Sequence, residues 1–314
     1  MLGMDLMSQY PPKSSRPEAW RVLGLSRNMA PGTQLVHGER QSMQRVLVTG
    51  AAGGIGTYLR RLLKPVYSGL VISDLKQPAD LKSDEKFIKA DLTKPTDIEK
   101  ACEGIEGIVH LGGFSVEGPW ETILNANIIG CYNLFEAARK AGVKRIIFAS
   151  SNHAVGFYPR TTTIPTEVIP RPDSRYGLSK VFGEGLGALY AYKHGIGVTS
   201  LRIGNVNDEP IDVRRLSIWL KPEDLVKLIR IGLERPGLVY EVMYGVSDNA
   251  RSWYDNSHAA ELGYKPEGRS KDYEAAAFAA QAKLPKDEAG DFYQGGTFCS
   301  SEYSADFATM KSKS

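Results

Sequence analysis

The sequence predicts a doubly wound α/β fold, in which helices cover both faces of a mostly parallel sheet. Three observations predict it. Short runs rich in Val, Ile and Leu alternate with longer amphipathic stretches, the short runs are apolar throughout, as in strands buried on both faces, and a glycine-rich turn follows the first run. Parallel strands joined through helices then require right-handed crossovers.

The predicted elements follow one another in a regular order. The strand-like runs are 45–49, 70–74, 107–111, 144–150 and 197–203. The helical segments between them are 54–64, 94–103, 121–141 and 176–193. Beyond Gly204 the alternation weakens, and we expect a helix near 222–234 and a strand near 238–244 in a small lobe over the carboxyl ends of the strands.

Composition places the chain among globular proteins. Its 314 residues are 42% hydrophobic and 24% charged, which is enough to bury a sizeable core. The 39 basic and 36 acidic residues form no block of like charges, so neither nucleic acid nor a membrane is an expected partner. Three widely spaced cysteines match no zinc site, which favours a reducing compartment and no structural metal. No apolar run approaches the roughly 18 residues that span a bilayer, and we expect a cytoplasmic protein.

A glycine-rich turn, TGAAGGIG, joins the first predicted strand to the first helix. Gly50 permits a tight turn, Gly53 lets the backbone approach a pyrophosphate, and Gly56 lets the helix pack closely on the strand. The second strand ends in Asp74, whose carboxylate can accept hydrogen bonds from the adenosine ribose and would repel a 2′-phosphate. The pattern therefore predicts NAD, although Lys76 is placed where it could receive the 2′-phosphate of NADP.

Five more residues complete the predicted contacts in this half of the cofactor site. Gly54, Ile55 and Leu75 flank the turn and the end of the second strand. Asp91 and Leu92 follow another strand-like run, KFIKA, and two interpretations of them remain open: a contact with adenine, or the N-terminal region of a helix.

A pair of serines at a strand end and a Tyr-x-x-x-Lys motif frame a second candidate site. Tyr176 and Lys180 lie one turn apart on the same face of a predicted helix, and Ser150 and Ser151 end a neighbouring strand. A tyrosine hydroxyl is a poor base at neutral pH, so an ammonium group beside it is needed to favour the phenolate. We therefore expect Tyr176 to act as the base with help from Lys180, while Ser151 holds the reacting oxygen and the cofactor accepts or donates a hydride.

These motifs divide the chain into three predicted segments. Residues 1–42 contain several prolines, serines and arginines without a sustained apolar period, which predicts a disordered extension. Residues 43–204 form the predicted Rossmann domain, which binds NAD and carries the Ser/Tyr/Lys group. Residues 205–314 form a smaller substrate-binding lobe, interleaved with that domain.

The motifs together resemble the extended short-chain dehydrogenase/reductase superfamily from residue 44 onward. Finer motifs are similar to one family within it, the NAD-dependent uronate dehydrogenases: HLGGFSVEGPW, NANIIGCYNLFEAAR, FASSNHAVGFYP, RPDSRYGLSK, RRLSIWL, SWYDNSH and YQGGTF. The resemblance implies oxidation of the anomeric C1 hydroxyl of a hexuronate, such as glucuronate or galacturonate, to an aldarolactone with formation of NADH. We also expect a homo-oligomer.

The resemblance also implies the remaining contacts. The cofactor contacts that it adds are Leu111, Gly112, Gly113, Ser115, Lys180 at the nicotinamide ribose, and Val206. The substrate contacts are Ser115, Ser151, Asn152, His153, Asn205 and Arg214, the last of which binds the carboxylate. Asn205 stands where the family pattern has serine, and because an amide can also donate and accept, the contact is expected to persist with an altered sugar preference.

Alternatives stand beside these expectations. His153 can cap a turn after the strand, Arg214 can be a solvated loop charge, and Trp253, Tyr254 and the YQGGTF run favour packing or subunit contacts over catalysis. For the function, a nucleotide-sugar epimerase or dehydratase uses the same fold and Tyr/Lys pair but regenerates its NAD, and the small carboxyl-terminal lobe argues against a large nucleotide-sugar. A catalytically silent NAD-binding protein is disfavoured because the Ser/Tyr/Lys group is present.

Overall fold

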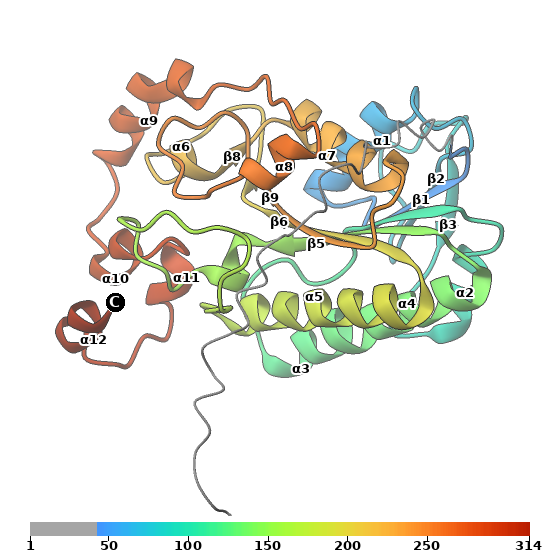
Figure 1. The fold of residues 1–314 in the computed structure, drawn as a ribbon, viewed down its shortest axis with the longest axis horizontal. Helices are drawn as coiled ribbons and strands as arrows, with labels where there is room; N and C mark the ends of the chain where they lie inside the picture. The colour runs from blue at the N-terminus through green and yellow to red at the C-terminus, as the bar shows by residue number, and fades with distance from the viewer. Residues whose placement is uncertain (1–42) are drawn as a thin grey trace, which may run out of the picture. The chain divides into compact units, whose positions relative to one another are not determined.

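A seven-stranded parallel sheet forms the centre of the fold (Figure 1). The computed structural model describes residues 43–314, so the predicted disorder of residues 1–42 lies outside the described residues. The strands lie in the order β3-β2-β1-β4-β5-β6-β9. Their bounds are β1 Val46–Thr49, β2 Val71–Asp74, β3 Lys86–Lys89, β4 Gly107–His110, β5 Arg145–Ser151, β6 Gly197–Ile203 and β9 Tyr240–Gly245.

Helices cover both faces of this sheet. In Figure 1, α1 (Gly54–Leu63) and α7 (Pro222–Glu234) lie on one face, and α2 (Pro95–Ala101), α4 (Gly130–Ala141) and α5 (Arg175–His194) lie on the other. The shorter elements are α3 Trp120–Ile123, the π-helix η1 Leu124–Ile129, the 3₁₀-helix η2 Asn152–Val155, β7 Asn205–Val206, α6 Arg215–Ile218, β8 Trp219–Leu220, α8 Ser257–Glu261, the 3₁₀-helix η3 Ser270–Tyr273, α9 Glu274–Gln281, α10 Glu288–Phe292, α11 Thr297–Ser300 and α12 Phe307–Lys313. Every helix within residues 43–314 is too short or too polar to cross a lipid bilayer.

Strand β1 shows why the strand-like runs are apolar throughout. Val46 and Val48 pack in the core beneath α1 and α7, whereas Leu47, between them, packs in the core beneath α2, α4 and α5. Successive side chains of a strand point to opposite faces, so a strand that is covered on both sides must be apolar at every position. All four residues of β1 are buried.

The strand order reverses between β1 and β4. From β1 the chain continues to β2 and β3 on one side, then crosses back to place β4, β5 and β6 on the other. At such a switch point the loops after neighbouring strands run apart, which leaves a crevice at the carboxyl ends of the strands. The glycine-rich turn after β1 and the loop after β4 border this crevice.

Strand β9 and helix α7, which correspond to the strand and helix expected in the carboxyl-terminal lobe, belong to the central sheet and to its helical cover. Strand β9 pairs with β6 along its whole length, from Tyr240 to Gly245, and the apolar face of α7 packs in the core beneath α1. Burial of that face explains the placement, because an amphipathic helix is stable only when its apolar face is covered. The proposed boundary at residue 204 stays a prediction.

The predicted helical segment 121–141 forms, but its middle part is a π-helix. The chain forms α3, then a π-helical segment over Leu124–Ile129, and only then α4. A π-turn inserts one extra residue per turn and often lies at a functional site. Asn127, the buried residue of this segment, bonds to neighbouring segments instead of facing solvent.

Candidate active site

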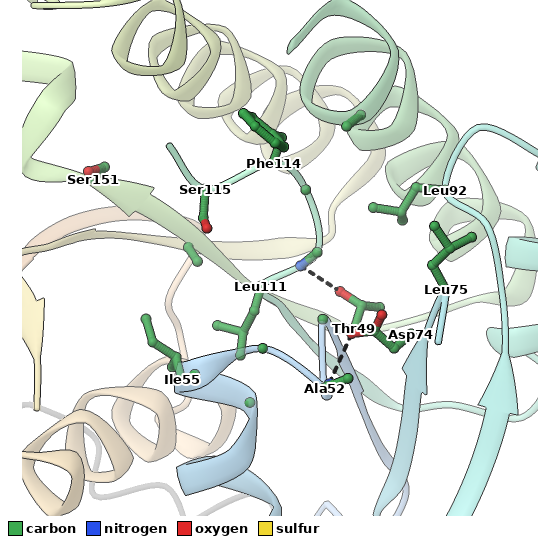
Figure 2. A pocket seen from close by; sticks show the side chains of 18 of the residues that line it. Thr49, Ala52, Ile55, Asp74, Leu75, Leu92, Leu111, Phe114, Ser115 and Ser151 are labelled. Atoms are coloured by element: carbon green, nitrogen blue, oxygen red, sulfur yellow. Dashed lines mark hydrogen bonds between the residues drawn. The ribbon is translucent and has the colours of Figure 1, made fainter. Parts of the chain in front are cut away.

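A cavity of about 1090 Å³ opens at the switch point of the sheet (Figure 2). The ends of β1, β2, β4, β5 and β6 contribute to its walls. All the predicted cofactor contacts, from Gly50 to Val206, line it, and so do the three predicted catalytic residues, Ser151, Tyr176 and Lys180. The fold therefore brings the two candidate sites of the sequence into a single cavity.

The glycine turn forms the floor of this cavity. Gly50 has a φ of +71°, and a Cβ there would lie 2.8 Å from the backbone nitrogen of Gly112. A Cβ on Gly56 would clash with the carbonyl oxygen of Gly50, so only glycine allows α1 to approach the strand this closely. At Gly54, in contrast, a Cβ would meet no atom of the described chain within 4 Å. Its missing side chain leaves open space at the N-terminus of α1, which suits a bound phosphate.

Asp74 is fixed at the edge of the cavity by two backbone donors. Its Oδ2 accepts a hydrogen bond from Ala52 N at 2.9 Å, drawn as a dashed line in Figure 2, and its Oδ1 accepts one from Lys76 N at 3.2 Å. Leu75 and Leu92 line the same part of the cavity with apolar surface. A carboxylate between apolar side chains is the arrangement that suits the ribose and adenine of a dinucleotide.

Tyr176 and Lys180 lie together on α5, as the spacing predicts. The Lys180 Nζ donates a hydrogen bond to the Ala149 carbonyl at 2.8 Å and lies 5.4 Å from the centre of the Tyr176 ring. The first turn of α5 is held by two acceptors: the Ser174 Oγ accepts from Gly177 N at 2.9 Å, and a Glu117 oxygen accepts from Tyr176 N at 2.9 Å. The position of the tyrosine is thus fixed through its own backbone.

The π-helical segment connects the loop after β4 to α5. The Asn127 Oδ1 accepts from Phe114 N at 2.7 Å, while its Nδ2 donates to the Phe114 carbonyl at 2.9 Å and to the Ser179 Oγ at 3.0 Å. Phe114 and its neighbour Ser115 line the cavity. No sequence pattern indicated this role for Asn127, because the π-turn that directs it inward has no simple residue signature.

A buried ion pair between Glu184 and Arg202 stabilises the carboxyl end of β5. The Ser150 Oγ donates to a Glu184 oxygen at 2.5 Å, and Arg202 donates to both oxygens of Glu184 at 2.9 Å. Because Glu184 and Arg202 are both buried, loss of either one would leave an uncompensated charge, at a cost of about 3–5 kcal/mol. The network keeps Ser151, the next residue, at the cavity wall.

His153 is held on two sides. Its Nδ1 lies 2.7 Å from the Oδ2 of Asp173, whose side chain is fully buried, and its ring stacks on Phe298 with 3.9 Å between ring centres. Burial lowers the pKa of His153 below its usual value, although the Asp173 carboxylate opposes this shift. The ring also meets Tyr176 edge to face, at 5.9 Å between centres, and lines the cavity.

Two predicted substrate contacts, Asn152 and Arg214, are not among the residues that line the cavity. Only one orientation of the Asn152 amide satisfies both of its ends: the Nδ2 then donates to the Ile203 carbonyl at 3.1 Å, and the Oδ1 accepts from the Arg214 Nη2 at 3.0 Å. The Arg214 Nε donates to the Gln294 carbonyl at 2.8 Å. Burial, reinforced by the neighbouring Arg215, lowers the pKa of Arg214 to about 10. Among the described residues no carboxylate forms an ion pair with this guanidinium.

Asn205 presents an unused acceptor. Its Oδ1 is buried and has no hydrogen-bond partner among the described residues, although the residue lines the cavity. A buried polar atom without a partner costs free energy, so it commonly serves a ligand. The contact of Asn205 with substrate stays a prediction.

The aromatic residues of the carboxyl-terminal part pack in two different places. Trp253 and Tyr254 are buried, and Tyr254 stacks on Tyr244 with 4.2 Å between ring centres, which agrees with a packing role. Phe298, at the end of YQGGTF, packs against the rings of both His153 and Tyr176. These contacts agree with the packing role expected for the YQGGTF run, and they bring its last residue next to two residues that line the cavity.

Fold and site together define the class of protein: a parallel α/β enzyme with a dinucleotide-sized cavity at its switch point and a Ser/Tyr/Lys group beside it. Residues 46–208 match the NAD dependent epimerase/dehydratase family. The chain is 45% identical over 255 residues to a uronate dehydrogenase of Pseudomonas putida, which covers 81% of this chain and 95% of that protein. The chain belongs to this NAD-dependent family and, within it, to the uronate dehydrogenases.

Solved structures agree with this assignment. A glucuronic acid dehydrogenase from Chromohalobacter salexigens superposes with a TM-score of 0.79 at 43% identity, covering 82% of this chain and 97% of that one. A point mutant of uronate dehydrogenase from Agrobacterium tumefaciens, complexed with NAD, gives a TM-score of 0.78 at 42% identity, with the same coverage. In both comparisons this chain covers nearly the whole length of the relative.

Proposed function

We propose that the protein oxidises the C1 hydroxyl of free hexuronates, such as glucuronate and galacturonate, to aldarolactones, with reduction of NAD to NADH. Family membership supports the reaction, and one observation carries the substrate class. Arg214 is a desolvated guanidinium without an ion-pair partner among the described residues. Its Nη2 donates to Asn152, whose two neighbours in the chain, Ser151 and His153, line the cavity. A carboxylate on the sugar would supply the missing counter-charge.

The residues at the switch point fit NAD. Gly54 leaves room for the pyrophosphate at the N-terminus of α1, and Asp74 directs a carboxylate toward the adenosine ribose. When bound, NAD supplies the acceptor for the hydride of the oxidised carbon. Lys180, whose Nζ lies beside the Tyr176 ring, is placed to donate to the second ribose.

The chain's own side chains manage the proton and the oxygen. Tyr176 accepts the proton of the C1 hydroxyl, and the Lys180 ammonium stabilises the phenolate that does so. Ser151 donates a hydrogen bond to the same oxygen as it becomes a carbonyl. Ser115, His153 and Asn205 line the cavity and hold the remaining sugar hydroxyls. Asn152 and Arg214 do not line it, so their contacts with the sugar, Arg214 with the carboxylate at the far end of the ring, require these side chains to shift when the sugar binds.

Purified protein mixed with NAD and free glucuronate or galacturonate is expected to form one NADH per sugar oxidised, as measured by absorbance in the NADH band. Neutral aldoses should react poorly, because they lack the group that Arg214 binds. Consumption of a nucleotide-sugar without net NADH, detected by product chromatography, would instead support an epimerase.

Asp74 is expected to set the preference for NAD over NADP. Asp74→Ser removes the ribose acceptor and the repulsion of a 2′-phosphate, so kcat/KM with NAD should fall by about 10- to 100-fold while that with NADP stays or rises. Steady-state kinetics with both cofactors measure the ratio. Lys76→Ala serves as the matched control from the same loop and should leave the NAD value nearly unchanged. Equal use of both cofactors by the unmodified protein would contradict this role of Asp74.

We further infer a cytoplasmic homo-oligomer. Cys102, Cys131 and Cys299 are free, buried thiols, which suits a reducing compartment. Helix α5 exposes an apolar stripe at the helical spacing 178, 182, 189 and 192, made of two leucines, a phenylalanine and a tyrosine. Such a continuous stripe favours contact with a second copy of the chain.

A further inference from the structure

Asp173 occupies a carboxylate pocket built from backbone that approaches unusually closely. A Cβ on Gly156 or on Gly295 would clash with its Oδ2, and a Cβ on Gly177 would lie 3.1 Å from its Oδ1. These glycines come from the end of η2, the first turn of α5 and the loop before α11. The pocket therefore holds this side chain in one place and leaves no space for a longer one.

The hydrogen bonds around Asp173 have a defined direction. The Ser174 Oγ accepts from Gly177 N at 2.9 Å, so its hydroxyl proton is free to donate to the Asp173 Oδ1, 2.7 Å away. The Oδ2 faces the Nδ1 of His153 at 2.7 Å. An ionised carboxylate can only accept, so the shared proton belongs to the Nδ1 of His153. A neutral ring then carries its lone pair on Nε2, at the opposite edge.

The edge of the His153 ring that carries Nε2 is the part left for the cavity. Asp173 holds Nδ1, Phe298 stacks on one face, and Tyr176 meets the ring edge to face, so the imidazole has little freedom to turn. His153 nevertheless lines the cavity. Nε2 is therefore the ring nitrogen that remains for a ligand, on a ring whose centre lies 5.9 Å from that of Tyr176.

We propose that Asp173 is a positioning residue that fixes His153 as a hydrogen-bond acceptor at Nε2, so that the site selects a sugar hydroxyl that donates to it. The inference rests on the proposed function for the identity of the ligand, but not for the state of the ring. The carboxylate acts only through His153, and it contacts neither sugar nor cofactor.

Asp173→Asn is expected to exchange the donor and acceptor nitrogens of the His153 ring. The Ser174 hydroxyl still donates toward the Oδ1 position, so the oxygen of the new amide will occupy that side and its NH₂ will face the Nδ1 of His153. Nδ1 must then accept, and the proton moves to Nε2. A donor at Nε2 opposes the donating sugar hydroxyl, and kcat/KM for uronate should fall by about 10- to 100-fold.

The ring state is measured directly by ¹⁵N NMR of the histidine side chains in the NAD-bound protein, with His153→Gln used for assignment. The expected result at neutral pH is a protonated Nδ1 and an unprotonated Nε2 in the unmodified protein, and the reverse in Asp173→Asn. A proton on Nε2 in the unmodified protein would overturn the proposal, whether or not the variant folds. This outcome is separate from the proposed function, which fails only if uronates are not oxidised.

Kinetics and a matched control complete the test. Asp287→Asn changes another carboxylate that is closely approached by a glycine, Gly290, and that accepts from a serine, Ser300, but has no histidine partner within residues 43–314. It should alter neither the His153 signals nor uronate turnover. In Asp173→Asn the melting temperature and the Kd for NAD should remain close to those of the unmodified protein. Reversal of the ring without any loss in kcat/KM would show that Nε2 does not contact the sugar, and would also overturn the proposal.

Discussion

Replacing Tyr176 by phenylalanine is expected to lower kcat for uronate oxidation by about 10²- to 10⁴-fold, the range that a general base contributes. The substitution removes only the hydroxyl. The ring itself packs against His153 and Phe298, at 5.9 Å and 6.1 Å between ring centres, and those contacts persist in phenylalanine. The Kd for NAD, measured by fluorescence titration, should therefore stay nearly unchanged while single-turnover NADH formation slows.

Helix α5 offers a matched control for this substitution. Tyr190 is buried on the same helix and its hydroxyl donates to Glu136 at 2.9 Å, away from the cavity. Tyr190→Phe removes an equivalent hydroxyl and should reduce stability slightly without changing kcat. If Tyr176→Phe turns over uronate as fast as the control does, another group is the base and the role of the Tyr/Lys pair must be revised.

The strands of the sheet could be predicted almost entirely from the sequence, because the pattern that indicates each strand lies within a short run of residues. A strand buried on both faces is apolar throughout, and Val46, Leu47 and Val48 show that pattern within a single short run of chain. The placement of β9 beside β6 could not be predicted in the same way, because a long-range pairing depends on which edge remains open once the other strands have assembled. The π-turn at Asn127 was missed because it depends on tertiary hydrogen bonds.

The site was predictable only where the residues keep fixed spacings. The glycine turn, Asp74 and the Tyr176/Lys180 pair follow from strand–turn–helix geometry, and the cavity contains all of them. Phe298 and Asp173 reach the site through the carboxyl-terminal segment and a glycine-lined pocket, neither of which has a sequence period. A single sequence does not distinguish such residues from residues that only pack.

Arg214 is the residue whose removal should distinguish a uronate dehydrogenase from a general sugar dehydrogenase. A uronate differs from its parent aldose by a carboxylate far from C1, so recognition requires a cation on the side opposite the base. Arg214 meets this requirement because it is a buried cation, still charged at neutral pH with a pKa of about 10, without an ion-pair partner among the described residues. Asn152 occupies only part of its donor set. A guanidinium can then offer parallel donors to both oxygens of the sugar carboxylate.

Arg214→Ala is accordingly expected to lower kcat/KM for glucuronate and galacturonate by roughly 10- to several hundred-fold, since a charge-assisted hydrogen bond contributes about 1.5–3 kcal/mol. Part of the loss should appear in kcat, because a loosely held ring misplaces C1 relative to the cofactor. Arg215→Ala is the matched control: that neighbour already pairs with Asp212 at 2.5 Å and should tolerate the change. Arg214→Lys should recover only part of the activity, since an ammonium lacks the planar fork.

The ratio of uronate to neutral-aldose turnover separates carboxylate recognition from damage to the fold. Arg214 also holds the carboxyl-terminal segment, through its bond to Gln294 and its close packing on Gly296, so Arg214→Ala could lose activity through local disorder alone. Disorder would depress both substrates together, whereas loss of the carboxylate contact depresses only the uronate and collapses the ratio. If Arg214→Ala is silent and Arg215→Ala abolishes turnover, the binding cation is the neighbouring arginine. If both variants keep the ratio of the unmodified protein, no arginine here binds the carboxylate, and the substrate class must be sought among sugars without one.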